Sequence, residues 1–511
     1  ETDDRILEFF DALRHIHYAE SDADLMPNST YMAKLAYCEL YAHQCAIVIS
    51  RRNRNDIRNH RHPRSHKYDL MSRFKSVLPF EMTGAQQRAC DQIFADMQKD
   101  IPMMRLVQGD VGSGKTIVAL LAALLAVDNG YQACIMAPTE ILANQHYETI
   151  TKLLKDSIVS CQLLTGSTTT KQRQSLHEQL RNGEINILIG THALIEKEVQ
   201  FANLGLCIID EQHRFGVAQR AKLWEKNIHP PHVLVMTATP IPRTLAMTVY
   251  GDLHVSIIDE LPPGRKPVQT LHYNIERRVT INQFITQQIE LGRQVYVVYP
   301  LIQENEKLDL QDLQNGYNLL CQTFPNYRIS MVHGQMRGKD KDEQMARFAK
   351  GDTQILVATT VIEVGVNVPN ASVMIIENAE RFGLSQLHQL RGRVGRGADQ
   401  SYCLLLTKLE ISKDTRKRMD IMVATNDGFR IAEADLQLRG PGDLEGTQQS
   451  GLPFDLHIAS LTHDGQILEI ARQTALAILD ADPLLEEMHN RIYKQRLDHL
   501  RQTVVNWGEI S

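Results

Sequence analysis

Residues 109–116 read Gly-Asp-Val-Gly-Ser-Gly-Lys-Thr, which fits the pattern G-x-x-x-x-G-K-[ST]. Apolar residues at 104, 106 and 107 precede this stretch as a short strand, and residues 117–127 follow it as an apolar helix. This order lets backbone N–H groups and the positive end of a helix surround a phosphate. We therefore expect a nucleotide-binding loop made of Gly109, Asp110, Val111, Gly112, Ser113, Gly114, Lys115 and Thr116.

Two side chains of this loop have specific roles in the pattern. Lys115 is placed to reach the β- and γ-phosphates, and the Thr116 hydroxyl is placed to ligate Mg²⁺. The alternative is an ordinary glycine-rich turn between a strand and a helix, which would carry neither role. The loop does not indicate what the nucleotide is used for, so evidence for that use has to come from other segments of the chain.

Composition and charge set broad limits on the class of protein. The 511 residues are enough for about three domains, and the net charge of −6 gives no argument for nucleic acid or membrane binding. Eight scattered cysteines without a C-x-x-C pair indicate reduced, buried thiols in a cytosolic protein. No apolar run approaches the length of a membrane span, and no signal peptide opens the chain. Because the chain starts without Met, we expect it to be a fragment of something longer.

The texture of the sequence predicts four regions. Residues 1–77 are helical, with an apolar-rich stretch at 31–49, and residues 411–511 are mixed, with a glycine-rich turn region and a charged helical tail. Between them, residues 78–265 and 266–410 each alternate short apolar strands with amphipathic helices, which is typical of a parallel sheet flanked by helices. The breaker-rich residues 261–267 join the two series. The expected strands lie at 103–107, 133–137, 185–189, 206–210, 233–237, 294–299, 328–332, 354–358, 373–377 and 402–406.

The segment from Arg51 to Lys75 is strongly basic, with nine Lys or Arg residues against two Asp. It is either a solvated helix face or linker, or a patch that contacts phosphates. His62 and His66 are four residues apart, but Pro63 would disrupt the helix that places them on one face, and the surrounding cations disfavour a metal ion.

An apolar strand that ends in two acids supplies the next element of a phosphate-loop enzyme. In residues 206–213, Leu-Cys-Ile-Ile-Asp-Glu-Gln-His, Asp210 can hold Mg²⁺ through water and Glu211 can orient and deprotonate the attacking water. Thr237 and Thr239, at the end of a further strand, could bond this acidic pair or simply cap the strand. Gln86 carries an amide that can read adenine, although alone it looks like any glutamine at a helix start.

The second series contains three arginines among glycines at residues 389–396, Gln-Leu-Arg-Gly-Arg-Val-Gly-Arg. Arg393 and Arg396 are candidates for arginine fingers that meet the γ-phosphate of ATP across a cleft between two lobes. The alternative is a solvated basic turn. Arginine fingers would explain why two lobes share one phosphate loop.

These segments match, in order from Phe80 to Arg396, the motifs of superfamily 2 helicases and translocases. Residues 210–217, 137–140, 190–194 and 240–244 narrow the resemblance to the RecG family of branched-DNA translocases. The resemblance implies two RecA-like lobes in tandem, with ATP and Mg²⁺ bound between them. It assigns Phe80, Gln86 and Gln389 to the nucleotide, and it assigns coupling roles to Gln212, His213, Thr237, Thr239, Glu363, Gly365 and Asn367.

Beyond the lobes, residues 427–451 resemble the family's translocation element, in which a helical hairpin and loop couple lobe motion to duplex movement. Arg439 and Gln449 are its coupling residues here. Three departures stand out: the family's N-terminal wedge domain is absent, Asn367 stands where Asp is more common, and Gln448 replaces a usual Arg. The last two changes each remove a charge.

Motors of this class grip the phosphate backbone, so DNA binding should depend on salt and hardly on sequence. The expected contacts lie in loops at strand ends that face away from ATP, where hydroxyls and backbone N–H groups suit phosphates. Each residue alone is also an ordinary turn former. The candidates are Pro138, Thr139, Thr165, Gly166, Thr191, His192, His333, Gly334, Thr359 and Thr360.

The resemblance thus implies an ATP-driven DNA translocase that reverses forks and migrates Holliday junctions in recombination and repair. Its expected partners are branched double-stranded DNA and, as a further candidate, the single-stranded-DNA-binding protein, with no membrane contact. We expect a monomer in the bacterial cytoplasm, associated with the nucleoid. Two alternatives stay open: a transcription-repair coupling translocase, which shares the translocation element, and a nucleotide-gated DNA-binding module that does not translocate.

Overall fold

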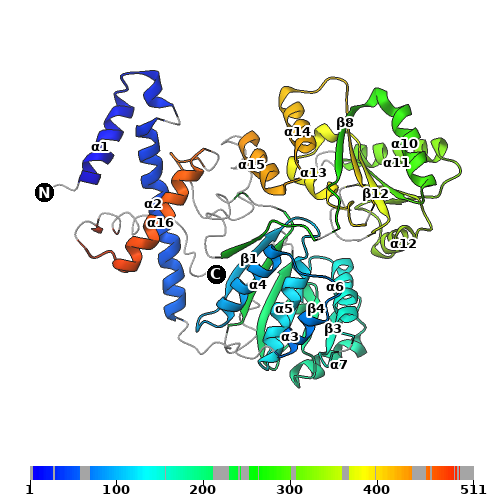
Figure 1. Cartoon of the computed structure of the whole chain (residues 1–511), viewed down its shortest axis with the longest axis horizontal. Coiled ribbons are helices and arrows are strands. Elements are labelled where there is room, and N and C mark those ends of the chain that lie inside the picture. Colours follow the sequence, from blue (N-terminus) through cyan, green and yellow to red (C-terminus); the bar gives the residue numbers. More distant parts are fainter. Residues whose placement is uncertain are drawn as a thin grey trace.

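The computed structural model describes residues 4–26, 29–57, 69–155, 157–210, 230–239, 242, 253–262, 264–300, 306–359, 368–397, 399–439, 456–460, 463–487, 490–491 and 494. Two parallel sheets follow one another along the chain, and helices from its two ends pack together beside them (Figure 1). This is the predicted α/β fold of two tandem RecA-like lobes. The predicted boundaries after residues 77, 265 and 410 remain predictions.

The first sheet has the order β3-β4-β2-β5-β6-β1-β7, and every neighbouring pair of strands is parallel. Its central strands are buried along their whole length, because helices and loops cover both faces. The strands are β1 (Met104–Gly109), β2 (Gln132–Met136), β3 (Cys161–Leu164), β4 (Ile187–Gly190), β5 (Leu204–Asp210), β6 (His232–Thr237) and β7 (His254–Ile258).

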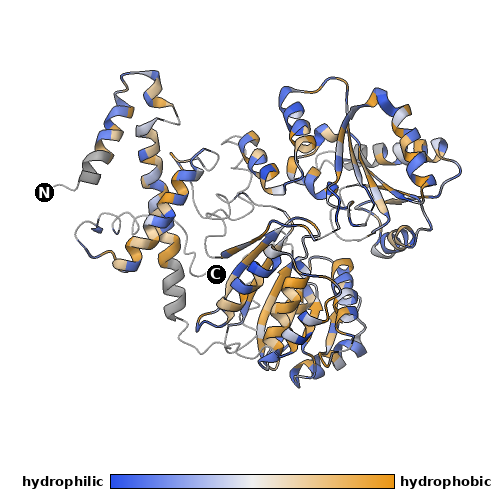
Figure 2. Cartoon of the chain, viewed as in Figure 1, coloured by the Kyte–Doolittle hydropathy of each residue, from blue (hydrophilic) through white to orange (hydrophobic). Residues whose placement is uncertain are grey.

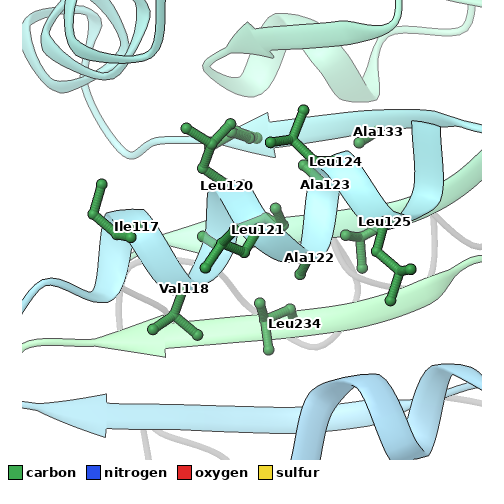
Figure 3. Packing of buried hydrophobic residues seen from close by; sticks show 14 of the residues in the cluster. Ile117, Val118, Leu120, Leu121, Ala122, Ala123, Leu124, Leu125, Ala133 and Leu234 are labelled. Carbon is green, nitrogen blue, oxygen red and sulfur yellow. The ribbon is translucent and has the colours of Figure 1, made fainter. Parts of the chain in front are cut away.

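Successive side chains of a central strand point to opposite faces of the sheet and pack into two different cores of the first lobe. Leu206 and Ile208 of β5 face one core, while Cys207 and Ile209 face the other. The first core is closed by α5, whose leucines lie against Ala133 and Leu234 of neighbouring strands (Figure 3). Each fully buried leucine contributes roughly 1.5–3 kcal/mol. Figure 2 shows the result as a largely hydrophobic α5 beside more polar outer helices.

In the part of the first lobe and its approach that the structure describes, there are five helices and a 3₁₀ turn. They are α3 (Asp69–Ser76), α4 (Gly84–Met97), α5 (Lys115–Asp128), α6 (Glu140–Leu153), α7 (Thr170–Arg181) and η2 (His192–Ile195). All eight cysteines of the chain are free thiols, as the sequence predicted. A hydrogen bond with Cys134 and burial both raise the pKa of the Cys207 thiol.

The second sheet has the order β10-β11-β9-β12-β13-β8, again with parallel neighbours throughout. Its strands are β8 (Gln269–Asn274), β9 (Gln294–Val298), β10 (Ile329–Val332), β11 (Ile355–Ala358), β12 (Ala371–Ile376) and β13 (Tyr402–Thr407). Its helices are η4 (Ile275–Arg277), α10 (Arg278–Glu290), α11 (Glu306–Thr323), α12 (Gly338–Ala349), η7 (Ala379–Arg381) and α13 (Leu384–Arg391).

Three strands, β3, β7 and β8, were not predicted from the sequence. All three lie at sheet edges, and each is only partly buried. An edge strand pairs on one side and covers less core, so its apolar signal is weaker than that of a central strand.

The two ends of the chain meet in one helical unit. The long helix α2 (Thr30–Ile57) packs against α16 (Gly465–Ala481), with α1 (Asp4–His17) and η1 (Asp22–Leu25) beside it. The carboxylate of Glu39, only 5% exposed, accepts backbone N–H bonds from His457, Ile458 and Ala459 at 2.8–2.9 Å. The sequence did not predict this pairing of α2 with α16. No helix of the described ranges is long and apolar enough to cross a bilayer.

Two further helices follow the second sheet and pack on its lobe. α14 (Lys413–Ala424) and α15 (Gly428–Arg439) both pack on α13, and Ser385 of α13 donates to Asp435 of α15 at 2.9 Å. The start of the predicted translocation element is therefore attached to the second lobe. Its remaining part, residues 440–451, lies outside the described residues.

We predict that Glu39→Gln loosens the attachment of residues 457–459 to α2. The amide is uncharged and turns a donor toward backbone donors, which should cost about 1–3 kcal/mol locally. Amide hydrogen exchange at residues 457–459 should accelerate about fivefold or more. The exposed Glu469→Gln on α16 is the matched control and should leave exchange unchanged; equal protection in both variants would contradict the anchoring role.

Candidate nucleotide site between the two lobes

The phosphate loop between β1 and α5 has the backbone shape that its glycines predict. Gly112 and Gly114 have φ of 78° and 86°, in the left-handed region where side chains are strained. A Cβ added at Gly109 would lie 2.7 Å from Ser113 Oγ and 2.9 Å from the carbonyl oxygen of Ile258. Glycine is therefore required at all three positions for the loop to close in this form.

Lys115 and Thr116 begin α5 directly after this loop. The Lys115 ammonium is buried and donates to the carbonyl oxygens of Gly109 at 2.7 Å and Asp110 at 3.0 Å. It thus lies inside the curve of the loop, and contact with a phosphate requires it to exchange these bonds. Thr116 is half-buried in the first helical turn.

Gln86 of α4 lies against the phosphate loop. Its Nε2 donates to the Ser113 carbonyl at 2.7 Å, and its Oε1 accepts from the Thr83 backbone N–H at 3.0 Å. Both ends of the amide are therefore occupied by protein groups, so Gln86 clamps the loop, and recognition of adenine by Gln86 stays a prediction. Phe80, which was also assigned to the nucleotide, precedes α4 and is 44% exposed.

Asp210 ends β5 and lies at the same sheet edge as the phosphate loop. Its Oδ2 accepts a hydrogen bond at 2.8 Å from Nε2 of His146, a residue of α6 that the sequence analysis did not single out. The described residues contain no group of three or more potential metal-ligating side chains. Glu211, Gln212 and His213 lie outside the described residues.

Thr237 and Thr239, at the end of β6, have different hydrogen-bond partners. The Thr237 hydroxyl bonds the backbone of Thr239, which caps the strand. The Thr239 hydroxyl accepts a hydrogen bond from Nε2 of Gln389 in the second lobe. The expected bond from these threonines to the acidic pair is not among the contacts of the described residues, and Thr239 instead joins the two lobes.

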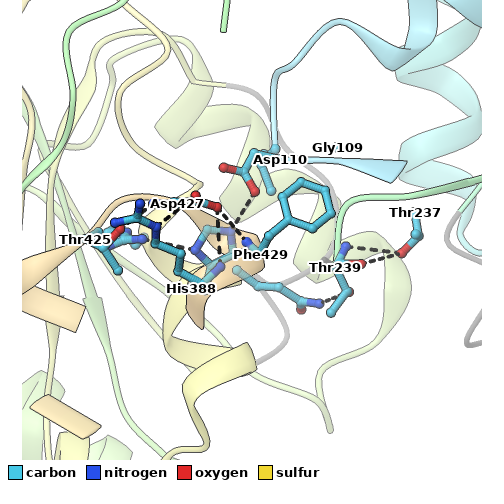
Figure 4. Close-up of polar contacts among 12 residues, drawn as sticks. Gly109, Asp110, Thr237, Thr239, His388, Thr425, Asp427 and Phe429 are labelled. Carbon is cyan, nitrogen blue, oxygen red and sulfur yellow. Dashed lines mark hydrogen bonds and ion pairs between the residues drawn. The ribbon is translucent and has the colours of Figure 1, made fainter. Parts of the chain in front are cut away.

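A polar chain runs from the phosphate loop into the second lobe (Figure 4). Asp110 Oδ1 pairs with His388 Nε2 at 3.1 Å, and His388 Nδ1 contacts the Arg391 guanidinium at 3.0 Å. Arg391 then donates to the carbonyl oxygens of Met422 and Thr425 at 2.9 and 2.8 Å, just before α15. Burial alone would raise the pKa of the Asp110 carboxyl, but the hydrogen bond and charge of His388, with Lys115 and Arg391, lower it.

Arginines from the linker and the second lobe concentrate positive charge beside the loop. Arg265 donates to the Val111 carbonyl at 3.0 Å. Burial, reinforced by the charges of Arg393 and Arg265, lowers the pKa of Arg396 to about 9, although Tyr296 opposes the shift. A guanidinium stays protonated at neutral pH, so this shift reports chiefly the burial of Arg396, and to a lesser degree the like charges of Arg393 and Arg265. Such a site fits an anion. The sequence did not predict that Arg265 would belong to it.

The remaining assigned coupling residues are not placed by the structure. Glu363, Gly365, Asn367 and Gln449 lie outside the described residues, as does Thr360 of the DNA set. Arg439 ends α15, and its side chain is also outside the described part.

The candidate DNA loops do not lie on a separate edge from the nucleotide site. In the first sheet they follow β2, β3 and β4, and because the strands of that sheet are parallel, these loops share its carboxyl edge with the phosphate loop. The others follow β10 and β11 at the carboxyl edge of the second sheet. They differ in lateral position: in the first sheet they follow the strands on the β3 side of β5, whereas the phosphate loop and Thr237 follow strands on the other side. The loops predicted to face away from ATP are therefore separated from the phosphate loop along the sheet, by strand order, and do not lie at its opposite end.

Several candidate DNA residues have buried side chains. Thr165, Thr191 and Thr359 are at most 8% exposed, so their hydroxyls are not presented to a backbone phosphate. The Thr139 hydroxyl caps α6 by accepting from Leu142. Gly166, His192 and Gly334 are exposed, and Pro138 and His333 are half-buried.

Three family models match consecutive parts of the chain. Residues 83–248 match the DEAD/DEAH box helicase, residues 277–398 match the helicase conserved C-terminal domain, and residues 425–511 match the ATP-dependent DNA helicase RecG, domain 3, C-terminal. Together they include most strands of both sheets, though not β7, β8 and β13, and the segment from residue 425 onward.

Whole-chain comparisons agree with these matches. An ATP-dependent DNA helicase RecG from Synechocystis sp. is 53% identical over 82% of this chain and 50% of its own length. The RecG helicase of Bacillus subtilis is 45% identical over 99% of this chain and 73% of its own length. A solved RecG structure, bound to a three-way DNA junction, matches with a TM-score of 0.71 and 41% identity over 89% of this chain and 61% of that one. The chain spans about half the length of the Synechocystis relative, and it belongs to the RecG family of DNA helicases.

Proposed function

We propose that this chain is the motor core of an ATP-dependent translocase that moves on duplex DNA and remodels branched DNA. The main support is the polar chain that joins the phosphate loop to α13 and α15: Asp110, His388 and Arg391 connect the nucleotide site with the base of the translocation element. A nucleotide-gated module that does not translocate has no need of this connection.

ATP binds between the lobes in this proposal. The amides of the phosphate loop and Lys115 hold the phosphates, while Arg393 and Arg396 stabilise charge on the γ-phosphate from the second lobe. Glu211 follows Asp210 at the carboxyl end of β5 and deprotonates the attacking water. The crowded positive charge around Arg396 favours an anionic substrate such as a nucleoside triphosphate.

Mg²⁺ fits the donor set that Thr116 and Asp210 offer, a hydroxyl and a carboxylate at one sheet edge. When bound, the ion would neutralise charge on the phosphates. His146 holds Asp210 in place through the Oδ2 atom, which orients the carboxylate for this task.

DNA passes over the loops that follow β2, β3 and β4 in the first sheet and β10 and β11 in the second. In the first sheet these strands lie on the β3 side of β5, and the phosphate loop lies on the other side. The exposed Gly166, His192 and Gly334 lie in these loops. Branched DNA is the favoured substrate, because the relative with a solved structure is bound to a three-way junction. Fork reversal and Holliday-junction migration in recombination and repair follow from this choice.

The cellular setting belongs to the same proposal. The motor would work as a monomer in the bacterial cytoplasm at the nucleoid. The single-stranded-DNA-binding protein is its candidate protein partner, because branched DNA exposes single strands. The relatives found are bacterial proteins, which supports the location.

The interlobe pair Asp110–His388 should be energetically coupled in nucleotide binding. We predict that Asp110→Asn and His388→Gln each weaken binding of a non-hydrolysable ATP analogue, and that the double variant is weaker by less than the sum. The coupling should be about 1 kcal/mol, because the Asp110 side chain is 26% exposed. The distant pair Asp414→Asn and His388→Gln is the control and should be additive; additivity for Asp110 as well would remove the contact from the coupling route.

Catalysis by Glu211 is tested by displacement of a third strand from a DNA triplex. Glu211→Gln should lower DNA-stimulated ATP hydrolysis at least a hundredfold and abolish displacement, since the amide cannot accept the proton. Glu178→Gln, an exposed carboxylate on α7, should behave like the unaltered chain. Equal displacement by the Glu211→Gln and unaltered proteins would overturn the proposal of an ATP-driven motor.

A further inference from the structure

Arg265 lies in the breaker-rich linker between β7 and β8, the only described covalent link between the two sheets. Its Nη1 donates to the carbonyl oxygen of Val111 at 3.0 Å. A Cβ added at Gly112 would lie 2.2 Å from Nη1 and 2.4 Å from Nη2 of Arg265. The guanidinium therefore lies directly on the middle of the phosphate loop.

The second lobe also closely approaches Val111, at its side chain. A Cβ added at Gly392, which ends α13, would lie 2.9 Å from Cβ and Cγ2 of Val111. Val111 thus meets the linker through its carbonyl and α13 through its side chain. Both contacts depend on how the second lobe is arranged relative to the first.

Fixing this carbonyl also fixes an amide. The peptide unit between Val111 and Gly112 is planar and trans, so its carbonyl and the Gly112 N–H point in opposite directions. A guanidinium that holds the carbonyl on one side presents the N–H on the other. N–H groups of such loops are the groups that bind phosphates.

We propose that Arg265 is a positioning residue of the nucleotide site: by holding the Val111 carbonyl from the linker, it orients the phosphate loop for binding and ties that orientation to the arrangement of the lobes. This inference rests on the proposed function, because it requires that the loop binds a nucleotide. It assigns a role to a residue outside the helicase motifs that the sequence revealed.

The charge distribution supports this placement. Burial lowers the pKa of the Arg265 guanidinium, and its charge contributes to the lowered pKa of Arg396. Holding cations together in this way costs free energy that bound phosphates recover by attraction. A role limited to chain connection would not need a cation at this position.

The test uses the purified 511-residue chain with Arg265→Gln, Arg265→Lys and, as the matched control, Lys266→Gln, an exposed cation next in the same linker. Equilibrium titration with ADP and with a non-hydrolysable ATP analogue gives the affinities. Arg265→Gln should weaken both about tenfold, the loss expected of one hydrogen bond to a charged group. Arg265→Lys should recover part of the loss, and Lys266→Gln should bind like the unaltered chain.

Two further measurements separate positioning from other roles. In DNA-stimulated ATP hydrolysis, Arg265→Gln should raise KM with kcat within about twofold, because uniform binding is lost. Amide hydrogen exchange of residues 109–116 should accelerate in Arg265→Gln while exchange of β1, β6 and α4 stays unchanged, which shows that the lobe is folded.

The outcomes are distinct. Unchanged affinity and unchanged loop exchange in Arg265→Gln would overturn the inference, and so would a fall in kcat at unchanged affinity, which would place Arg265 in the chemical step. Failure of the unaltered chain to bind either nucleotide would instead overturn the proposed function. An equal loss of nucleotide affinity in Lys266→Gln would mean that only the total charge of the linker matters, and this result would also overturn the inference.

Discussion

Parallel pairing of every strand is the constraint on which the rest of this structure depends. Because all strands of a sheet run the same way, the phosphate loop, Asp210 and Thr237 leave β1, β5 and β6 at one edge. Within that edge, the strand order alone decides which groups are neighbours. The order places β5, β6 and β1 side by side, so the phosphate loop meets two segments that follow it by about 100 residues or more.

The second lobe completes this site through a small number of polar contacts. His388 pairs with the phosphate loop, Gln389 bonds Thr239, and Arg265 holds the Val111 carbonyl from the linker. Each contact joins a nucleotide-side group to the second lobe or to the linker that leads into it. A change at the phosphates therefore alters the contacts that set the relative position of the lobes, which is the physical requirement for a motor driven by hydrolysis.

Much of this arrangement could be predicted from local sequence, because buried central strands and glycine-rich loops carry strong local signals. The strands at 133–137 and 206–210 are apolar apart from Asp210 and were found within two residues of their observed limits. The edge strands β3, β7 and β8 were missed because their partial burial leaves mixed sequences. Arg265, His146 and His388 act through contacts with residues distant in sequence, which no local pattern reveals. Arg265 was hidden further by its place in a stretch that reads as a linker.

The helical unit at the two ends of the chain adds a second mechanical connection. The segment that resembles the translocation element leaves α15, which is attached to α13 through Ser385 and Asp435. At residues 457–459 the chain is held again, this time by the buried Glu39 carboxylate of α2. The element is therefore bracketed by one attachment on the second lobe and one on the helical unit. Under the proposed function, movement of the second lobe relative to α2 would change the separation of these two attachments, whereas an element attached at one end only would move passively with its lobe.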